Sequence, residues 1–232
     1  MNIIIRLLFF CSFFSLSIIQ LQAQDWPNLS RYEDSNKKLG LPLPNEDRVV
    51  FMGNSITEGW LTLNPDFFKG KPYINRGISG QTTPQMLLRF RADVIDLKPK
   101  VVVILAGTND LAGNTGPATL EMIEGNIMSM CELAAANKIA VVLCSVLPAY
   151  DYEWKKGTYP MAKIAALNKW MKTYAEKNNH VYVDFYSAMV DERPGLRDDY
   201  SYDEVHPDLT GYKVMEPLVE FGISSALSKV KK

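Results

Sequence analysis

The sequence predicts a three-layer α/β/α sandwich around one parallel β-sheet, and two observations lead to that prediction. Five short runs of β-branched and other apolar residues recur along the chain, and segments with a helical spacing of apolar residues separate them. The runs lack the polar and apolar alternation of a strand with one solvent face, so each is expected to be buried on both faces. Such strands, joined by helices, form parallel sheets with helices on either side.

The expected elements follow in order along the chain. Strands are expected at residues 49–52, 72–76, 100–106, 139–146 and 180–185. The third run is almost entirely Val, Ile and Leu, so it is expected at the centre of the sheet. Helices are expected from residue 55 and over residues 82–96, 117–137, 160–178 and 210–230, with a weaker helical pattern over 29–39. Pro84 stands in the first turn of its helix, where the missing N–H costs little.

Length and composition bound the number of domains and the class of partner. A chain of 232 residues with 47% hydrophobic content is long enough for one well-buried domain, and no polar linker or internal repeat divides it. Its 25 basic and 26 acidic residues give a net charge of -1, without the basic excess that nucleic-acid binding uses. We therefore expect no nucleic-acid partner.

The first 23 residues have the features of a secretory signal peptide. A basic residue precedes an apolar run over residues 7–21, and Ala23 supplies a small residue for cleavage. The run is short and rich in serine, whereas a membrane span needs about 20 predominantly apolar residues. We therefore expect an exported protein, periplasmic or extracellular, with no stable membrane anchor. Its single domain would cover residues 24–232 and begin with a polar arm over residues 24–47.

Export permits a disulfide between Cys131 and Cys144, the two cysteines that remain after the signal peptide is removed. Cys131 lies in a helical pattern and Cys144 in a strand pattern, where a free cysteine behaves as a small hydrophobe. This placement favours free thiols. The two histidines, His180 and His206, have no metal-ligand spacing with the cysteines, so we expect no metal and no other cofactor.

Ser55 is the candidate nucleophile because of where the predicted topology places it. It follows the first strand and opens the next helix, at the carboxyl edge of the sheet where open α/β sheets bind their ligands. The unpaired amides of a helix start can donate to negative charge that develops on a substrate oxygen. Taken alone, this serine is equally typical of a plain helix N-cap.

A nucleophilic serine needs a base and a group that orients the base. His206 follows the last strand and is therefore expected at the same sheet edge as Ser55, whereas His180 stands at the amino end of that strand, on the opposite edge. Asp203 stands three residues before His206 and can accept from the second imidazole nitrogen within one turn, which fixes the tautomer that takes the serine proton. An ordinary surface turn remains the alternative for this pair alone.

A tetrahedral oxyanion also needs donors besides the amide of Ser55. Gly80 follows the second strand and exposes its N–H with no side chain in the way, and Asn109 follows the third strand with a carboxamide N–H. Each residue taken singly is typical of a turn. Their positions after successive strands favour an oxyanion hole made by Ser55, Gly80 and Asn109.

Four segments together resemble the blocks of the SGNH hydrolases, the GDSL-like lipase and acylhydrolase family, in order and at fitting separations. The blocks are residues 53–57, 75–80, 107–110 and 203–207, and the resemblance covers residues 47–220. It implies a flavodoxin-like fold and a triad of Ser55, Asp203 and His206. It also implies that Gly80 and Asn109 complete the oxyanion hole.

Two positions depart from the family pattern. Asn54 stands where the family name has Asp, and Glu204 stands where a small Gly is frequent. We expect Glu204 to alter the rim of the site without removing a catalytic atom. The competing α/β-hydrolase fold needs G-x-S-x-G at its nucleophile, and here Thr57 occupies the second glycine position. The acid and base also lie close together near the chain end, which excludes that fold.

The resemblance implies ester or thioester hydrolysis and leaves the substrate open. Tyr150, Tyr152 and Trp154 follow the fourth strand and Tyr202 precedes Asp203, so flat aromatic faces suited to sugar rings are expected near the site. Burial of these rings as loop anchors is the alternative. The chain has no long apolar lid for a fatty chain, which favours a short acyl group such as acetyl.

We therefore expect an esterase that acts on small-molecule or glycan esters, with a carbohydrate O-acetyl ester as the first choice. The second choice is a lysophospholipase, or a general short-chain carboxylesterase or thioesterase. A non-catalytic sugar-binding module belongs to another class, and the intact set of five site residues argues against it.

Overall fold

The computed structural model describes residues 24–230, so the predicted signal peptide lies outside the described residues. Its strands are β1 (Val49–Gly53), β2 (Tyr73–Gly77), β3 (Val101–Leu105), β4 (Ala140–Cys144) and β5 (Val181–Val183). Neighbouring strands are parallel and lie in the order β2-β1-β3-β4-β5, which is the flavodoxin-like order. The predicted parallel sheet with the third strand at its centre is confirmed.

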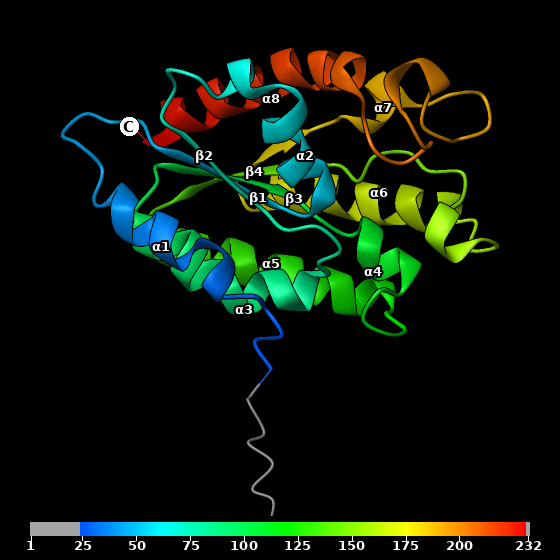
Figure 1. Ribbon diagram of the computed structural model, residues 1–232, viewed down its shortest axis with the longest axis horizontal. Coiled ribbons are helices and arrows are strands. Elements are labelled where there is room, and N and C mark those ends of the chain that lie inside the picture. Colours follow the sequence, from blue (N-terminus) through cyan, green and yellow to red (C-terminus); the bar gives the residue numbers. More distant parts are fainter. Residues whose placement is uncertain (1–23, 231–232) are drawn as a thin grey trace, which may run out of the picture.

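Helices cover both faces of this sheet, so the sheet and the two helix layers make a three-layer sandwich (Figure 1). One face carries α3 (Thr83–Asp93), α5 (Leu120–Ala136) and α6 (Met161–Lys177), with α1 (Ser30–Leu39) packed beside α3. The other face carries α2 (Ser55–Leu63), α7 (Tyr186–Met189) and α8 (Leu209–Val230). No helix in the described part of the chain is long and apolar enough to cross a bilayer.

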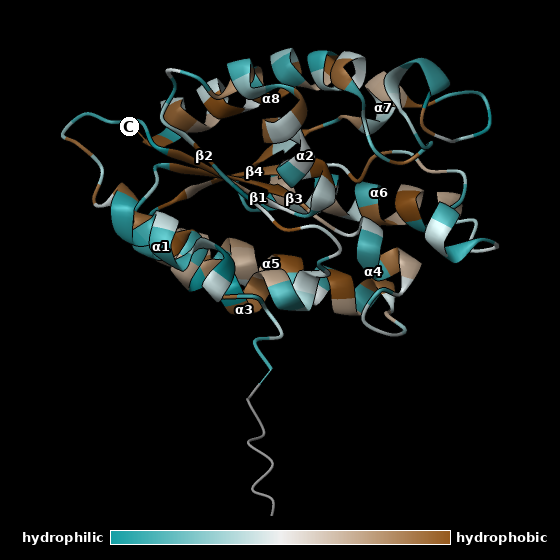
Figure 2. Ribbon diagram, viewed as in Figure 1, coloured by the Kyte–Doolittle hydropathy of each residue, from teal (hydrophilic) through white to brown (hydrophobic). Residues whose placement is uncertain are grey.

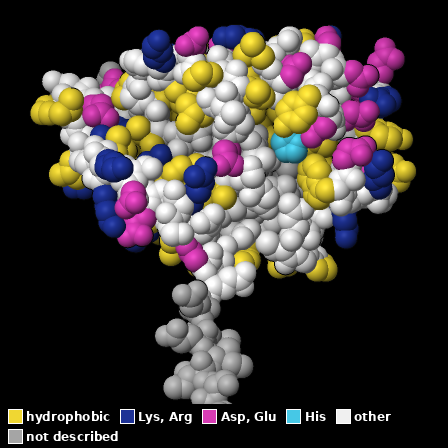
Figure 3. Space-filling model, viewed as in Figure 1, with side chains coloured by type: hydrophobic (Ala, Val, Ile, Leu, Met, Phe, Trp, Pro, Cys, Tyr) yellow, Lys and Arg dark blue, Asp and Glu magenta, His cyan; other side chains and the backbone are white. Residues whose placement is uncertain are grey.

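Successive residues of each strand point to opposite layers, and this alternation builds two hydrophobic cores. In β1, Val50 and Met52 pack among the apolar side chains of α3, α5 and α6, whereas Val49 and Phe51 pack against α2 and α8. Figure 2 shows the matching pattern on the helices, which are hydrophobic toward the sheet and hydrophilic outside. On the face of the molecule that Figure 3 shows, acidic and basic side chains are mixed, in keeping with the near-zero net charge.

Cys131 and Cys144 are free and buried. Cys131 belongs to the core on the α5 side of the sheet, and Cys144 to the core on the α8 side. The sheet therefore separates the two thiols, and the prediction that they are unpaired is confirmed.

Two short helices were not predicted. They are α4 (Thr108–Ala112) directly after β3, and α7 after β5. Each is little more than one turn, too short to show a helical period in the sequence, and such turns form only within tertiary packing. The start of α5 also lies later than expected, at Leu120, because the side chain of Thr119 caps it by accepting from the amide of Met122.

Close packing of α2 against β2 fixes the helix that begins with Ser55. A methyl group added at Gly77 would stand 2.2 Å from the backbone nitrogen of Glu58 and 2.8 Å from the carbonyl oxygen of Asn54. Backbone atoms cannot yield as a flexible side chain can, so this contact requires glycine. It sets the distance between the end of β2 and the start of α2.

Two glycine-to-alanine variants test this contact. Gly77→Ala should lower the free energy of unfolding by more than about 2 kcal/mol because its methyl group overlaps the α2 backbone. Gly125→Ala, in α5 with open space around its added methyl group, should raise the free energy of unfolding by about 0.5–1 kcal/mol. Urea titrations of both variants measure the difference, and equal effects would contradict the packing described here.

Candidate active site

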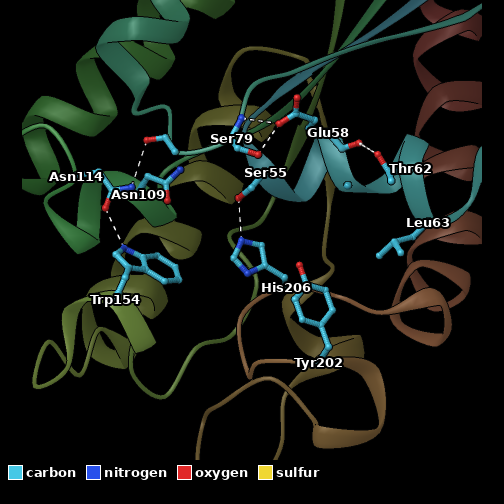
Figure 4. A pocket seen from close by; sticks show the side chains of 12 residues that line it. Ser55, Glu58, Thr62, Leu63, Ser79, Asn109, Asn114, Trp154, Tyr202 and His206 are labelled. Carbon is cyan, nitrogen blue, oxygen red and sulfur yellow. Dashed lines mark hydrogen bonds between the residues drawn. The ribbon is translucent and has the colours of Figure 1, made fainter.

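The carboxyl ends of three neighbouring strands meet at the site. Because β1 lies between β2 and β3, Ser55 at the end of β1 has Gly80 on one side and Asn109 on the other. The helix cap belongs to Asn54, whose side-chain oxygen accepts from the amide of Ile56 at 3.3 Å. The hydroxyl of Ser55 is therefore not the capping group, and it points toward His206 (Figure 4).

Ser55, His206 and Asp203 form a continuous chain of hydrogen bonds. The Oγ of Ser55 lies 2.9 Å from Nε2 of His206, and Nδ1 of His206 lies 2.7 Å from Oδ2 of Asp203. An ionised carboxylate can only accept, so Nδ1 donates to Asp203 and Nε2 is left to accept from Ser55. The side chains of His206 and Asp203 are 18% and 27% exposed, and His206 lines the cleft over Ser55.

The turn from Asp203 to His206 is built by backbone contacts as well. Oδ1 of Asp203 accepts from the amides of Val205 and His206 at 3.1 and 2.7 Å. The hydroxyl of Ser201 donates to the carbonyl oxygen of His206 at 2.8 Å. Glu204 lies in the left-handed region, with φ of 63°, a conformation that glycine adopts without steric cost. A glycine at this position would therefore relieve the steric cost that Glu204 bears.

Two further N–H groups stand beside Ser55. Gly80 has φ of +76°, and its amide donates to no group in the described part of the chain. Asn109 is 2% exposed, and its Nδ2 donates one hydrogen to the carbonyl oxygen of Gln81 at 2.9 Å, so its second hydrogen remains for a ligand. Figure 4 shows Asn109 and His206 approaching Ser55 from two sides.

Asp110 holds the segment of Asn109 against α3. Its carboxylate accepts from the amide and the hydroxyl of Thr83, with the shortest contact 2.6 Å. Burial raises the pKa of Asp110 to about 6, although the hydrogen bonds from Thr83 act in the opposite direction. The group therefore serves as a buried acceptor for the start of α3.

A cleft of about 610 Å³ opens over Ser55, a size suited to a small ligand or part of a larger one. Trp154 and Tyr202 form part of its wall and are 43% and 65% exposed. The ring of Tyr202 stacks parallel to that of His206, with centroids 5.8 Å apart, and Trp154 lies 5.9 Å from His206. Two exposed aromatic faces therefore flank the imidazole.

The other two aromatic residues expected at the site do not line this cleft. Tyr152 is fully buried, its hydroxyl lies 3.3 Å from that of Thr108, and its ring stacks against Trp154. The expectation that Tyr152 contacts a substrate is therefore wrong. Its neighbours explain why, since the short helical turn over Glu153–Lys155 directs residue 154 outward and leaves residue 152 beneath it. Tyr150 packs against the ring of Tyr159 outside the cleft.

The structure adds cleft residues that the sequence did not single out. They are Glu58, Gly59, Thr62, Leu63, Ser79 and Asn114. Glu58 was within reach of sequence reasoning, because it lies three residues after Ser55 and so on the same helix face. Asn114 lies in an irregular loop, so no helical or strand spacing in the sequence points to it. Its side-chain oxygen accepts from Nε1 of Trp154 at 3.0 Å.

Glu58 is held as a carboxylate at the rim of the cleft. Its Oε2 accepts from the amide and hydroxyl of Ser79 at 2.9 and 2.5 Å, and its Oε1 accepts from Arg31 at 2.9 Å. Burial acts to raise the pKa of Glu58, but the bonds from Ser79 and Arg31 outweigh it and keep the pKa below its usual value. The residue thus joins α1, α2 and the loop after β2.

Comparison with known proteins gives concordant results. The model of the GDSL-like lipase/acylhydrolase family matches residues 51–214. A crystal structure of an acylhydrolase candidate from Bacteroides fragilis is 50% identical, with a TM-score of 0.87, and the match covers 88% of this chain and 100% of that one.

Two curated relatives are each 31% identical over shorter stretches. The lipoprotein YqeF of Bacillus subtilis matches over 156 residues, 60% of this chain and 64% of the relative. Esterase TesA of Pseudomonas aeruginosa matches over 99 residues, 41% of this chain and 48% of the relative. The chain thus spans less than two thirds of the length of either protein.

The strained turn beside His206 yields a prediction. The side chain of Glu204 is 53% exposed and only reaches Arg193 at 4.0 Å, so its removal costs little in contacts. Glu204→Gly should leave the free energy of unfolding unchanged or raise it by up to about 1 kcal/mol, whereas Glu204→Val should lower it by about 1–2 kcal/mol. Denaturant titrations decide, and a valine variant as stable as the glycine variant would contradict the left-handed turn.

Proposed function

Because this chain belongs to the GDSL-like lipase/acylhydrolase family, a family of ester-bond hydrolases, we propose that it cleaves short-chain esters with Ser55 as the nucleophile. One observation carries the proposal: the unbroken chain of hydrogen bonds from Ser55 Oγ through the His206 ring to Asp203, at 2.9 and 2.7 Å. This arrangement supplies a nucleophile, its base and the group that orients the base. A sugar-binding module without catalysis would have no use for it.

In the acylation step, Oγ of Ser55 attacks the ester carbonyl carbon while Nε2 of His206 takes the hydroxyl proton. Asp203 stabilises the imidazolium that forms. The carbonyl oxygen becomes an oxyanion and accepts from the amides of Ser55 and Gly80 and from the Asn109 carboxamide. Collapse of this intermediate breaks the bond to the alcohol oxygen, which receives the proton from His206 and leaves.

The acyl group then remains on Ser55 as an ester. A water molecule takes the place of the alcohol, gives its proton to Nε2 of His206 and attacks the acyl carbon. The second oxyanion uses the same donors. Its collapse releases the carboxylic acid and returns the proton to Ser55, which restores the enzyme.

The cleft favours a small acyl group on a polar alcohol. The polar side chains of Thr62, Ser79 and Asn114 line it beside the site residues, and Leu63 is the aliphatic side chain among its lining residues. The exposed rings of Trp154 and Tyr202 offer flat faces on which a sugar can stack. We therefore assign a carbohydrate O-acetyl ester as the preferred substrate class.

A lipid ester is the second candidate, and one observation favours it. Leu63 is an apolar side chain at the cleft that is 42% exposed, and it could contact an acyl or alkyl chain. A lysophospholipid would then be cleaved by the same site residues, as would general short-chain carboxylic esters or thioesters.

We also propose that the protein acts outside the cytoplasm, in the periplasm or the medium. The apolar segment at residues 7–21 supports export, as does the similarity to a lipoprotein of Bacillus subtilis. An acetylated glycan would be accessible in either location.

Substitutions at Asn109 test the oxyanion hole. Asn109→Ala should lower kcat by about 10² to 10³ with little change in KM, the usual range for loss of one such donor. Asn109→Asp should be worse, because it places an acceptor and a negative charge where negative charge develops. Steady-state kinetics beside thermal midpoints measure both effects. An aspartate variant as active as the parent would remove Asn109 from the mechanism.

Chain length and alcohol identity test the substrate class. The protein should release acetate from acetylated oligosaccharides, and its kcat/KM should be much higher for p-nitrophenyl acetate and propionate than for the octanoate. Ser55→Ala is the control and should hydrolyse none of them. A preference for octanoyl or longer esters, with no acetate released from glycans, would move the assignment to the lipid ester candidate.

A further inference from the structure

The amino-terminal arm contacts the segment that carries Gly80. The arm precedes residues 51–214, the part of the chain that matches the family, so nothing in the family match gives it a role. In the structure it packs along the loop that follows β2, over residues 77–81. This loop supplies one proposed oxyanion donor, the amide of Gly80.

The first two contacts come from α1. The hydroxyl of Tyr32 donates to the carbonyl oxygen of Gly77. Arg31 donates to Oε1 of Glu58 at 2.9 Å, and Oε2 of the same carboxylate accepts from the amide and hydroxyl of Ser79. These two residues of α1 thus reach the loop at positions 77 and 79, one directly and one through Glu58.

The third contact comes from the chain before α1. Nε2 of Gln81 donates to the carbonyl oxygen of Pro27 at 2.7 Å, and Gln81 is 4% exposed. Oε1 of Gln81 accepts from the buried guanidinium of Arg89 at 2.5 Å, and Arg89 also donates to the carbonyl oxygen of Gly53 at 2.9 Å. The side chain of Gln81 therefore joins the arm to the end of β1.

Gln81 also positions the second proposed donor. The backbone carbonyl oxygen of Gln81 accepts from Nδ2 of Asn109 at 2.9 Å, and this bond orients the carboxamide of Asn109. Gly80 itself has no side chain that could anchor it and adopts φ of +76°, so its amide direction depends on the bond that its carbonyl oxygen accepts from Asn114 at 3.3 Å and on what holds its neighbours. Those neighbours are Ser79, which the arm reaches through Glu58, and Gln81, which donates to Pro27 of the arm.

We propose that the arm holds the loop over residues 77–81 in place. Tyr32, Arg31 and Gln81 are then positioning residues for the amide of Gly80 and the carboxamide of Asn109. The inference rests on the proposed serine-esterase function for its catalytic consequence. Small displacements of such donors weaken the transition state far more than the bound substrate. Loosening the arm therefore lowers kcat and leaves KM nearly unchanged.

Tyr32→Phe is the main test, because it removes one hydroxyl and keeps the ring. Tyr73→Phe is its matched control, since that hydroxyl is also half-buried and donates one bond, to Glu220 of α8 at 2.8 Å, away from the loop. Tyr32→Phe should lower kcat for p-nitrophenyl acetate by about tenfold at constant KM. The control should keep the parent kcat even if its thermal midpoint falls as much.

Binding of a boronic acid separates positioning from general loosening. Its tetrahedral adduct on the serine places an oxygen among the same donors, so its Ki should rise in Tyr32→Phe by the factor by which kcat/KM falls. Arg31→Met, which removes the contact through Glu58, should show the same parallel change. Equal kinetics and equal Ki in Tyr32→Phe and Tyr73→Phe would overturn the inference.

Hydrogen exchange tests the arm without relying on activity. Peptides covering residues 77–82 should exchange faster in Tyr32→Phe and Arg31→Met than in the parent and in Tyr73→Phe. Unchanged exchange in both arm variants would overturn the inference. Failure of the proposed function would instead appear in the parent protein, which would hydrolyse no ester, while the exchange comparison would still decide whether the arm holds the loop.

Discussion

The hydrogen bond between Ser55 and His206 joins residues 151 positions apart, and the site depends on the fold that makes this distance of 2.9 Å possible. A parallel sheet brings the carboxyl ends of its strands to one edge, so loops from distant parts of the chain converge there. Close packing of Gly77 against the start of α2 fixes the position of Ser55 relative to the sheet. The hydroxyl of Tyr212 donates to the carbonyl oxygen of Ile56 at 2.7 Å and so links α2 to α8. The loop after β5 then needs only one tight turn to present both Asp203 and His206.

Sheet order explains why two proposed oxyanion donors stand beside Ser55. Because β1 has β2 and β3 as neighbours, the residues after those strands reach Ser55 from opposite sides. Asn109 is further oriented by Gln81, whose side chain is bonded to the arm and to Arg89. The proposed catalytic geometry thus depends on the strand order of the sheet, on the loop after β2 and on the contacts of that loop with the arm.

Sequence reasoning predicted the parts of this arrangement that follow from periodicity and strand ends. The five strands, the central place of β3 and the positions of Ser55, Gly80 and Asn109 at one sheet edge all depend on buried apolar runs, which are visible in a single sequence. Loops have no such period, which is why Tyr152 was expected in the cleft although it packs beneath Trp154. The bonds from Tyr32 and Gln81 were also out of reach, because they join polar side chains to backbone atoms that only the folded chain brings together.

The central claim is that Ser55 forms the covalent bond to the acyl carbon, and reaction with a p-nitrophenyl alkylphosphonate tests it most directly. This reagent transfers its phosphonyl group to an activated serine and the product hydrolyses slowly, so peptide mass spectrometry can locate it. The account predicts one p-nitrophenol released per protein molecule and one phosphonyl group on the peptide that contains Ser55, with neither seen in a folded Ser55→Ala variant. A phosphonyl group on another residue, or labelling of Ser55→Ala at the parent rate, would contradict the account.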